Sequence, residues 1–400
     1  MFLEIVVALV LGILTGIFTG IAPGIHINLI SLLVLSFSPM LLQITSPVVL
    51  GVYIISLAIT HSFLDVLPSI YLGAPDEAQA LNVLPGHRLL LKGEGHNAVV
   101  YTTLGSLGAL VLSVILFPVF IIGMKILAVP VQGVIGYLLI AIMAYMIFRD
   151  KSKWILSLTA FMLSGVLGLV VFSIPNLKQP LFPLLSGLFG LSLLLTSLME
   201  KSVIPKQKLE APLTLSNRTL VKSVTAASGM GFIAAFLPGF GSSQAAIIAT
   251  NIVGDIGDEG FLSLVGGINT ANMLISIATA YALNKSRNGA ILVVNQLSGV
   301  GWQEMLVFIA VALVAGGLAT VLTFGLSRIF ARLIVKVNYQ KLVLGIIIFI
   351  MVLVIYFDSF IGLTILATST AIGLVASKWG VGKNHLMGCL IVPVILYFVL

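Results

Sequence analysis

The sequence has 400 residues, of which 59% are hydrophobic and only 8% charged, and its mean hydropathy is +1.20. This composition excludes an ordinary soluble protein, because so few charges cannot cover a water-exposed surface. The net charge is +7, but the 20 Lys and Arg residues lie in short connections between apolar runs, so no nucleic-acid partner is expected. A single cysteine, Cys389, excludes an intramolecular disulfide. The sequence therefore predicts a multi-pass protein of the plasma or inner membrane, with the lipid bilayer as its surroundings.

Apolar runs follow one another along the chain, and most are long enough for a helix to cross a hydrocarbon layer of about 30 Å. Their apolar residues are continuous rather than alternating, which excludes an outer-membrane barrel. The predicted fold class is therefore an all-α polytopic membrane protein. The runs cover residues 2–22, 27–43, 47–70, 98–122, 130–148, 153–174 and 180–199, then 218–237, 241–254, 261–283, 303–328, 342–357, 360–378 and 385–400. Runs 27–43 and 241–254 are short, so each either spans the membrane or re-enters it as part of a hairpin.

The longest polar interval separates the first seven runs from the last seven and predicts two repeats. The expected parts are an N-terminal transmembrane repeat (1–200), a cytoplasmic linker (201–217) and a C-terminal transmembrane repeat (218–400). Gly16 is followed seven residues later by Pro23, as Gly231 is by Pro238, and Lys178 corresponds to Lys383 further on. An odd number of spans in each repeat predicts inverted repeats, which are common in secondary transporters.

The distribution of cations predicts which side of the membrane each connection occupies. If every run crosses, 16 of the 20 Lys and Arg residues fall on one side, which the positive-inside rule assigns to the cytoplasm. Both termini then lie outside. The four cations expected on the outer side are Lys125, Lys178, Lys285 and Arg287.

Two Pro-Gly pairs interrupt apolar runs at equivalent places in the two halves and predict broken helices. Proline removes a backbone N–H and glycine permits a turn, and the freed backbone groups are tolerated in a membrane only inside protein or a watery cavity. A half-helix that starts there offers N–H groups that suit an anion. The alternative is a simple kink capped by Asn28 and Ser242. The substrate-binding residues predicted here are Pro23, Gly24, His26 and Asn28 in the first half and Pro238, Gly239, Gly241, Ser242, Ser243 and Gln244 in the second.

A second pair of candidates follows the third apolar run of each half. The first is a turn containing Gly73 and Pro75, and the second carries two cations, Lys285 and Arg287. We predict that these are hairpin tips that meet near a substrate anion. The alternative is that both are ordinary loops at the membrane surface.

Ionisable residues within apolar runs are costly in a membrane and mark candidate functional sites. His61 and Asp65 are four residues apart and therefore share a helix face, which predicts a site for a coupling cation or a proton. The alternative is a pair that only joins two helices. Asn269 and Thr270 are added to this ion site, and Asn269 and Asn272 to the substrate site. Three further carboxylates, Glu4, Glu304 and Asp358, lie near the ends of runs and are expected to be solvated there.

No motif of an enzyme is evident. His61 and Asp65 lack the HExxH spacing of a metalloprotease, and the chain has no glycine loop of the Walker type. The faint similarity of Ser242 in its glycine-rich context to an intramembrane serine protease needs a histidine that only His385 offers nominally. We therefore predict that the chain is not an enzyme and holds no cofactor.

The segment IYLGAPDEAQALNVLPGHRLLLKGEG (70–95) resembles the large permease subunit of tripartite tricarboxylate transporters. The resemblance extends to the break that contains Gly241, to the acidic segment 257–260 and to the helix with Asn269 and Asn272, and it favours a shorter, archaeal-type member. It implies a secondary transporter of small organic anions, tri- or dicarboxylates, coupled to Na⁺ or H⁺. It also implies two partners, a small membrane subunit and an extracytoplasmic solute-binding protein.

Two other functions remain open from the sequence. Broken half-helices and basic tips suit phosphate as well as carboxylate, so a translocase for lipid-linked or other phosphorylated amphiphiles is the main alternative. A membrane scaffold or channel subunit is the third.

Overall fold

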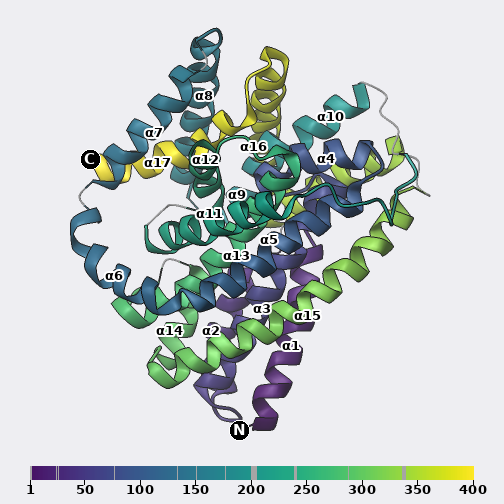
Figure 1. Ribbon diagram of the computed structural model, residues 1–400. Coiled ribbons are helices and arrows are strands. Elements are labelled where there is room, and N and C mark those ends of the chain that lie inside the picture. The colour runs from purple at the N-terminus through teal and green to yellow at the C-terminus, as the bar shows by residue number, and fades with distance from the viewer. Residues whose placement is uncertain are drawn as a thin grey trace.

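A computed structural model describes residues 2–23, 25, 27–75, 77–132, 134–149, 151–175, 177–199, 205–237, 241–286, 288–335 and 339–400. Within these ranges the chain is built of helices and connections and has no strand, which confirms the predicted all-α class (Figure 1). Eight of the described helices are long and apolar enough to cross a membrane.

The first half of the chain contains long helices joined by short helical segments. Two π-helical segments, η1 and η3, and one 3₁₀ segment, η2, interrupt the regular α-helices. The elements are α1 (Phe2–Ile21), α2 (Ile27–Leu41), α3 (Pro47–Leu64), η1 (Pro68–Leu72), η2 (Glu77–Asn82), α4 (Val83–Leu91), α5 (Gly95–Ile115), α6 (Phe117–Gln132), α7 (Ile135–Arg149), α8 (Trp154–Ser173), α9 (Leu181–Leu185), η3 (Ser186–Leu191) and α10 (Ser192–Met199).

The second half repeats the pattern of a long helix followed by a short one. Its elements are α11 (Asn217–Phe236), α12 (Ser242–Val253), α13 (Gly257–Leu283), α14 (Gly289–Ser298), α15 (Trp302–Ile334), α16 (Tyr339–Trp379), η4 (Lys383–Met387) and α17 (Gly388–Val399). At about 1.5 Å per residue, α2 with 15 residues and α12 with 12 are too short to cross the hydrocarbon layer by themselves.

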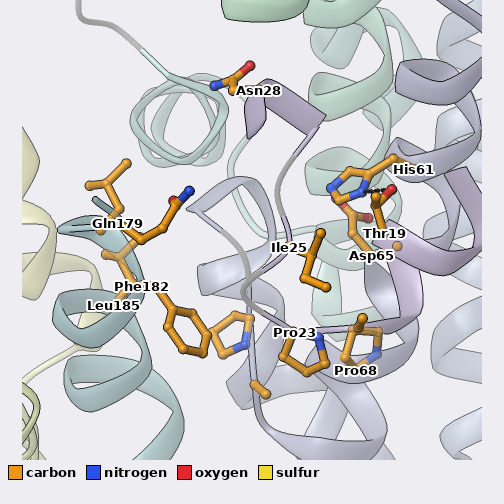
Figure 2. A pocket seen from close by; sticks show the side chains of 15 residues that line it. Thr19, Pro23, Ile25, Asn28, His61, Asp65, Pro68, Gln179, Phe182 and Leu185 are labelled. Atoms are coloured by element: carbon orange, nitrogen blue, oxygen red, sulfur yellow. Dashed lines mark hydrogen bonds between the residues drawn. The ribbon is translucent and has the colours of Figure 1, made fainter. Parts of the chain in front are cut away.

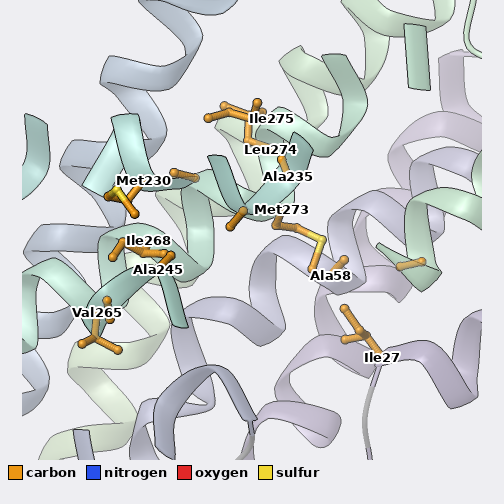
Figure 3. Packing of buried hydrophobic residues seen from close by; sticks show 14 of the residues in the cluster. Ile27, Ala58, Met230, Ala235, Ala245, Val265, Ile268, Met273, Leu274 and Ile275 are labelled. Carbon is orange, nitrogen blue, oxygen red and sulfur yellow. The ribbon is translucent and has the colours of Figure 1, made fainter. Parts of the chain in front are cut away.

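The centre of the molecule is formed by α3 and α13. Buried residues make up 83% of an apolar 18-residue stretch of α3 and 89% of one in α13, against 28% in α1 and 22% in α16. Helix α1 packs along α3 and α15 packs on α3, while α7, α8 and α17 form a separate group at one edge (Figure 1). Small side chains such as Ala58, Ala235 and Ala245 bring the central helices together (Figure 3). The peripheral helices expose large apolar side chains, as expected of surfaces in contact with lipid.

Glycines allow close contact between the first and third helices of each half. A Cβ added at Gly16 of α1 would lie 2.7 Å from the Leu57 carbonyl oxygen of α3, and one at Gly231 of α11 would lie 2.5 Å from Cβ of Ala271 in α13. Such small residues let helix backbones approach in a membrane, where packing rather than water drives association.

Helix α16 joins two runs that the sequence separates, and its kink corrects one prediction. Ser359 has φ 57° and ψ −154° at the point where the two helical parts meet. The neighbouring Asp358 is only 4% exposed, and its Oδ1 accepts hydrogen bonds from the backbone N–H groups of Lys178 and Gln179 at 2.7 and 2.9 Å. The expectation of a solvated carboxylate at Asp358 is therefore wrong, because the backbone just before α9 supplies two N–H donors in place of water.

Candidate functional site

The predicted helix interruptions are confirmed. Helix α1 ends at Ile21 and α2 begins at Ile27, while α11 ends at Phe236 and α12 begins at Ser242. Several predicted substrate-binding residues lie outside the described residues, and their placement stays untested: Gly24, His26, Pro238, Gly239 and Arg287.

A cavity of about 130 Å³, called here the first cavity, lies at the broken end of α1. Thr19, His61 and Asp65 from α1 and the end of α3 lie on one side, and Phe182 and Leu185 from α9 lie on the other (Figure 2). The predicted residues Pro23, Asn28, His61, Asp65 and Pro75 all line this cavity. The fold therefore brings the first helix break, the Gly73–Pro75 turn and the intramembrane ionisable pair to one place.

Asp65 is the single carboxylate among the described residues that line the first cavity. It caps α3 and is 3% exposed. Its Oδ1 accepts a hydrogen bond from Nε2 of Gln79, and its Oδ2 accepts one from Nδ2 of Asn269, both at 2.8 Å. Both donors are neutral amides, so these two bonds position the carboxylate without adding a positive charge.

Further polar groups surround this carboxylate. The Asn269 amide also donates to the Ser62 carbonyl oxygen at 3.4 Å, and the hydroxyls of Ser62 and Thr270 are 3.3 Å apart. Nδ1 of His61 lies 3.0 Å from Oγ1 of Thr19 in the last turn of α1. The predicted ion-site residues His61, Asp65, Asn269 and Thr270 are thus within one connected region, which draws on α1, α3 and α13.

Helix α13 connects this region to the start of α12. Asn272 lies three residues after Asn269, hence on the same face, and its Nδ2 donates to Oγ of Ser242 at 3.3 Å. Ser242, Ser243 and Gln244 are all buried in the first turn of α12, which Gly241 precedes in extended conformation. Oε1 of Gln244 is buried without a hydrogen-bond partner among the described residues.

The two predicted hairpin tips differ in position. Gly73 ends η1 with φ 62°, and a Cβ added at Gly190 would collide with the Gly73 carbonyl oxygen, so this turn packs closely against η3. Lys285 is exposed and lines neither cavity described here. Gly289, at the start of α14, instead brings this loop next to Asn28, since an added Cβ would lie 2.7 Å from its Oδ1.

A second cavity, of about 430 Å³, was not predicted from the sequence. It lies between η2 and α4, the turn from α12 to α13, and the segments that carry Phe189 and Lys383. At its edge, Nη2 of Arg88 forms an ion pair with Oδ1 of Asp258 at 2.8 Å. Nζ of Lys383 donates to Oγ of Ser192 at 2.9 Å and to the Phe189 carbonyl oxygen at 3.4 Å.

Several polar residues of these regions were not singled out in the sequence. Gln79 and Asn82 are fully buried, three residues apart in η2, and the Asn82 amide donates to Oε1 of Gln79 at 2.5 Å. The signal that could have found them is this polar pair at helical spacing directly after the Gly73–Pro75 turn. Lys383 carried no local signal, because its surroundings are contributed by η3 and α4.

Broken helices beside buried polar side chains in an all-helical, multi-pass membrane protein are typical of membrane transporters. Residues 6–388 match the Tripartite tricarboxylate transporter TctA family, and the chain belongs to this family. The chain is also 30% identical to uncharacterized protein MJ1079 of Methanocaldococcus jannaschii over 355 residues, which cover 86% of this chain and 88% of the relative. No solved structure matches the chain.

Proposed function

We propose that this chain is the permease of a secondary active transporter that moves small organic anions, tri- or dicarboxylates, across the plasma or inner membrane, with Na⁺ or H⁺ as the coupling cation. Family membership supports a transporter and a multi-pass membrane protein. A transporter of this kind needs no enzymatic activity and no cofactor.

The observation that carries the proposal is the carboxylate of Asp65, buried between helices of both halves of the chain at the broken end of α1. Buried ionisable groups in membrane helices mark ion or proton pathways. Asn269, which binds the carboxylate, also contacts the carbonyl oxygen of Ser62, and the Ser62 hydroxyl contacts that of Thr270. These are oxygen ligands of the type that hard cations prefer. Asp65 is the proposed ligand or proton carrier, and His61, Asn269 and Thr270 are its proposed supports.

For the anion, we propose the polar groups next to the helix breaks. The first turn of α12 offers Ser242, Ser243 and Gln244, and Asn28 and Asn272 lie near the same central helices. Free N–H groups at the start of a half-helix favour a carboxylate. The proposed partners follow from the family: a small membrane subunit and an extracytoplasmic solute-binding protein.

Uptake into liposomes tests this proposal. The purified chain, alone and with its two proposed partners, would be reconstituted and supplied with labelled citrate and a panel of di- and tricarboxylates under imposed Na⁺ or H⁺ gradients. We expect accumulation against the anion's gradient that depends on one of the two cation gradients.

Uptake that ignores both cation gradients would contradict coupling. An absence of uptake in every combination, together with movement of a phosphorylated lipid between leaflets, would replace the proposal by the translocase alternative. If neither occurs, a scaffold role is left.

A further inference from the structure

The second cavity lies close to the first. Along the segment from α9 to η3, Phe182 and Leu185 line the first cavity, and Phe189, one helical turn later, lines the second. In η2, Gln79 binds Asp65, which lines the first cavity, while the next residue, Ala80, lines the second. The two cavities are therefore neighbours along η2 and the segment from α9 to η3. Segment η3 is π-helical, a geometry often found at functional sites.

The second cavity has the size of a ligand site. Its volume of about 430 Å³ is within the range of small-molecule pockets and more than three times that of the first cavity, about 130 Å³. The larger cavity has room for an organic anion, whereas the smaller one suits an ion and its nearest ligands.

Lys383 provides this cavity with a positive charge that has no carboxylate partner in the described part of the chain. Both of its hydrogen bonds go to neutral oxygens, those of Ser192 and Phe189. The side chain is half-buried, and an ammonium withdrawn from water without a counter-ion is costly. An anion in the cavity would remove this cost and take up the remaining hydrogen-bonding capacity of the ammonium, which has three donors.

The carboxylates that share the cavity are already engaged elsewhere. Asp258 pairs with Arg88, and Oδ1 of Asp255 accepts a hydrogen bond from the Gly257 backbone N–H at 3.1 Å. Arg88 itself is 54% exposed at the edge, where an incoming anion can exchange for Asp258. The cavity thus offers one interior cation and one at its entrance.

We propose that the second cavity binds a small carboxylate anion, with the ammonium of Lys383 paired to one carboxylate group inside and Arg88 guiding the anion at the entrance. This inference deepens the proposed function and rests on it, because it adds to the polar groups at the helix breaks a second binding site for the same anion, in a cavity apart from the one that Asp65 lines. Asp65 holds the cation in the first cavity, and Lys383 holds the anion in the second.

Chemical protection of Lys383 tests the site without requiring transport. The wild-type chain would be treated near neutral pH with an amine-acylating reagent, with and without citrate, succinate or inorganic phosphate, and the modified peptides quantified by mass spectrometry. Lys378, exposed in the last turn of α16, is the internal control. We expect a carboxylate to slow acylation of Lys383 at least about tenfold and to leave Lys378 unchanged.

If Lys383 is acylated as fast with each anion of the panel as without any anion, the site is overturned. Protection by phosphate alone would overturn its carboxylate specificity. Lys383→Gln is expected to weaken citrate binding about 10- to 100-fold, since a charge-assisted hydrogen bond is lost, whereas Lys383→Arg and the control Lys378→Gln retain it. Coupled uptake with an unprotected Lys383 would leave the proposed function standing and remove this site. Selective protection of Lys383 without any uptake would support the anion site and contradict the proposed transport function.

Discussion

Because two amides donate hydrogen bonds to the Asp65 carboxylate, replacing one of its oxygens by an NH₂ group should affect both stability and the cation response. Gln79 donates to one carboxylate oxygen of Asp65 and Asn269 to the other. In Asp65→Asn, an NH₂ group replaces one of these oxygens, so it faces the donor of Gln79 or that of Asn269. A buried donor left without an acceptor costs about 1–3 kcal/mol, and the negative charge for a cation is lost. We therefore expect lower thermal stability and loss of the stimulation of uptake by Na⁺ or by a pH gradient.

Glu304→Gln is the matched control for this variant. Glu304 is a half-buried carboxylate in the first turn of α15, away from both cavities, so its neutralisation should leave the cation response intact. If Asp65→Asn responds to sodium and pH in the same way as the wild type, Asp65 takes no part in coupling.

The proposed anion site gives binding a defined pH dependence. Burial lowers the pKa of Lys383 from 10.5 to about 8, so the side chain carries its charge below this pH and loses it above. Citrate affinity should thus be greatest below about pH 8 and fall roughly tenfold for each further pH unit, as the protonated fraction falls. Calorimetric titration across this range is the measurement.

Other charged groups near Lys383 could also change the pH dependence of citrate binding. Burial and the charge of Lys383 lower the pKa of His87 to about 4, so His87 stays neutral throughout the range. Arg88, Asp255 and Asp258 line the same cavity. Lys383→Arg keeps its charge at all these pH values and should bind citrate with a flat profile. A fall of equal steepness in this variant would assign the titration to another group.

At the residue scale, the sequence indicated polar side chains in apolar runs but not which of these side chains meet. Asp65 and Asn269 were both singled out as polar residues in apolar runs, but they are 204 residues apart and their contact depends on the packing of α3 against α13. Lys383 was recognised only as a counterpart of Lys178, because nothing local distinguishes a lysine beside a cavity from one at a helix end.

At the scale of elements, the contact between α1 and α3 depends on glycine. Gly16→Leu would drive a side chain into the Leu57 carbonyl oxygen and the Thr60 side chain of α3. We expect α1 to move away from α3, which disturbs the first cavity through Thr19 and lowers the free energy of unfolding by about 1–3 kcal/mol. Thermal unfolding and uptake would both report the change.

Gly317→Leu is the control for helix propensity and lipid exposure. Gly317 lies in α15 and is exposed, and a Cβ added there would have nothing within 4 Å. Stability should stay the same or rise, because glycine is the weaker helix former. Equal stability of the two leucine variants would show that α1 does not depend on this close contact.

The helix ends near proline and glycine were predictable because their physics is local, whereas the long helices were not divided correctly everywhere. The run 98–122 covers parts of two helices, α5 and α6, which meet at Leu116 just before Pro118. The runs 342–357 and 360–378 form α16, whose kink at Ser359 is fixed by the buried contact of Asp358 with the α9 region. Tertiary contacts therefore placed these boundaries.

At the scale of the whole molecule, the packing of the two halves is related. Helix α3 runs parallel to α15, since Gly51 meets Phe308 and Phe63 meets Thr323. In the same way α13 runs parallel to α5 and α6, because its Thr279 reaches Met124 and its start lies near Tyr101 through Thr214. Helices α5 and α15 are antiparallel, with His96 beside Ser327 and Leu110 beside Gly316. Inverted repeats, still a prediction, require this arrangement.

Cysteine labelling would test the inversion directly. The turn after α2 and the turn after α12 are equivalent in the two repeats, and they carry the exposed residues Gln43 and Asp255. If the repeats are inverted, these turns lie on opposite sides of the membrane. A membrane-impermeant maleimide should therefore label Gln43→Cys from outside the cell and Asp255→Cys only after the cytoplasmic face is opened, as the positive-inside rule orients the chain.

The chain supplies its own background for this measurement. Its single cysteine, Cys389, is fully buried and should stay unlabelled in the parent protein. Labelling of both engineered positions from one side would mean that the repeats run in the same direction. The second cavity, which Asp255 lines, could then no longer be assigned to the face opposite the α2–α3 turn, and alternating access by exchange between two inverted halves would lose its structural basis.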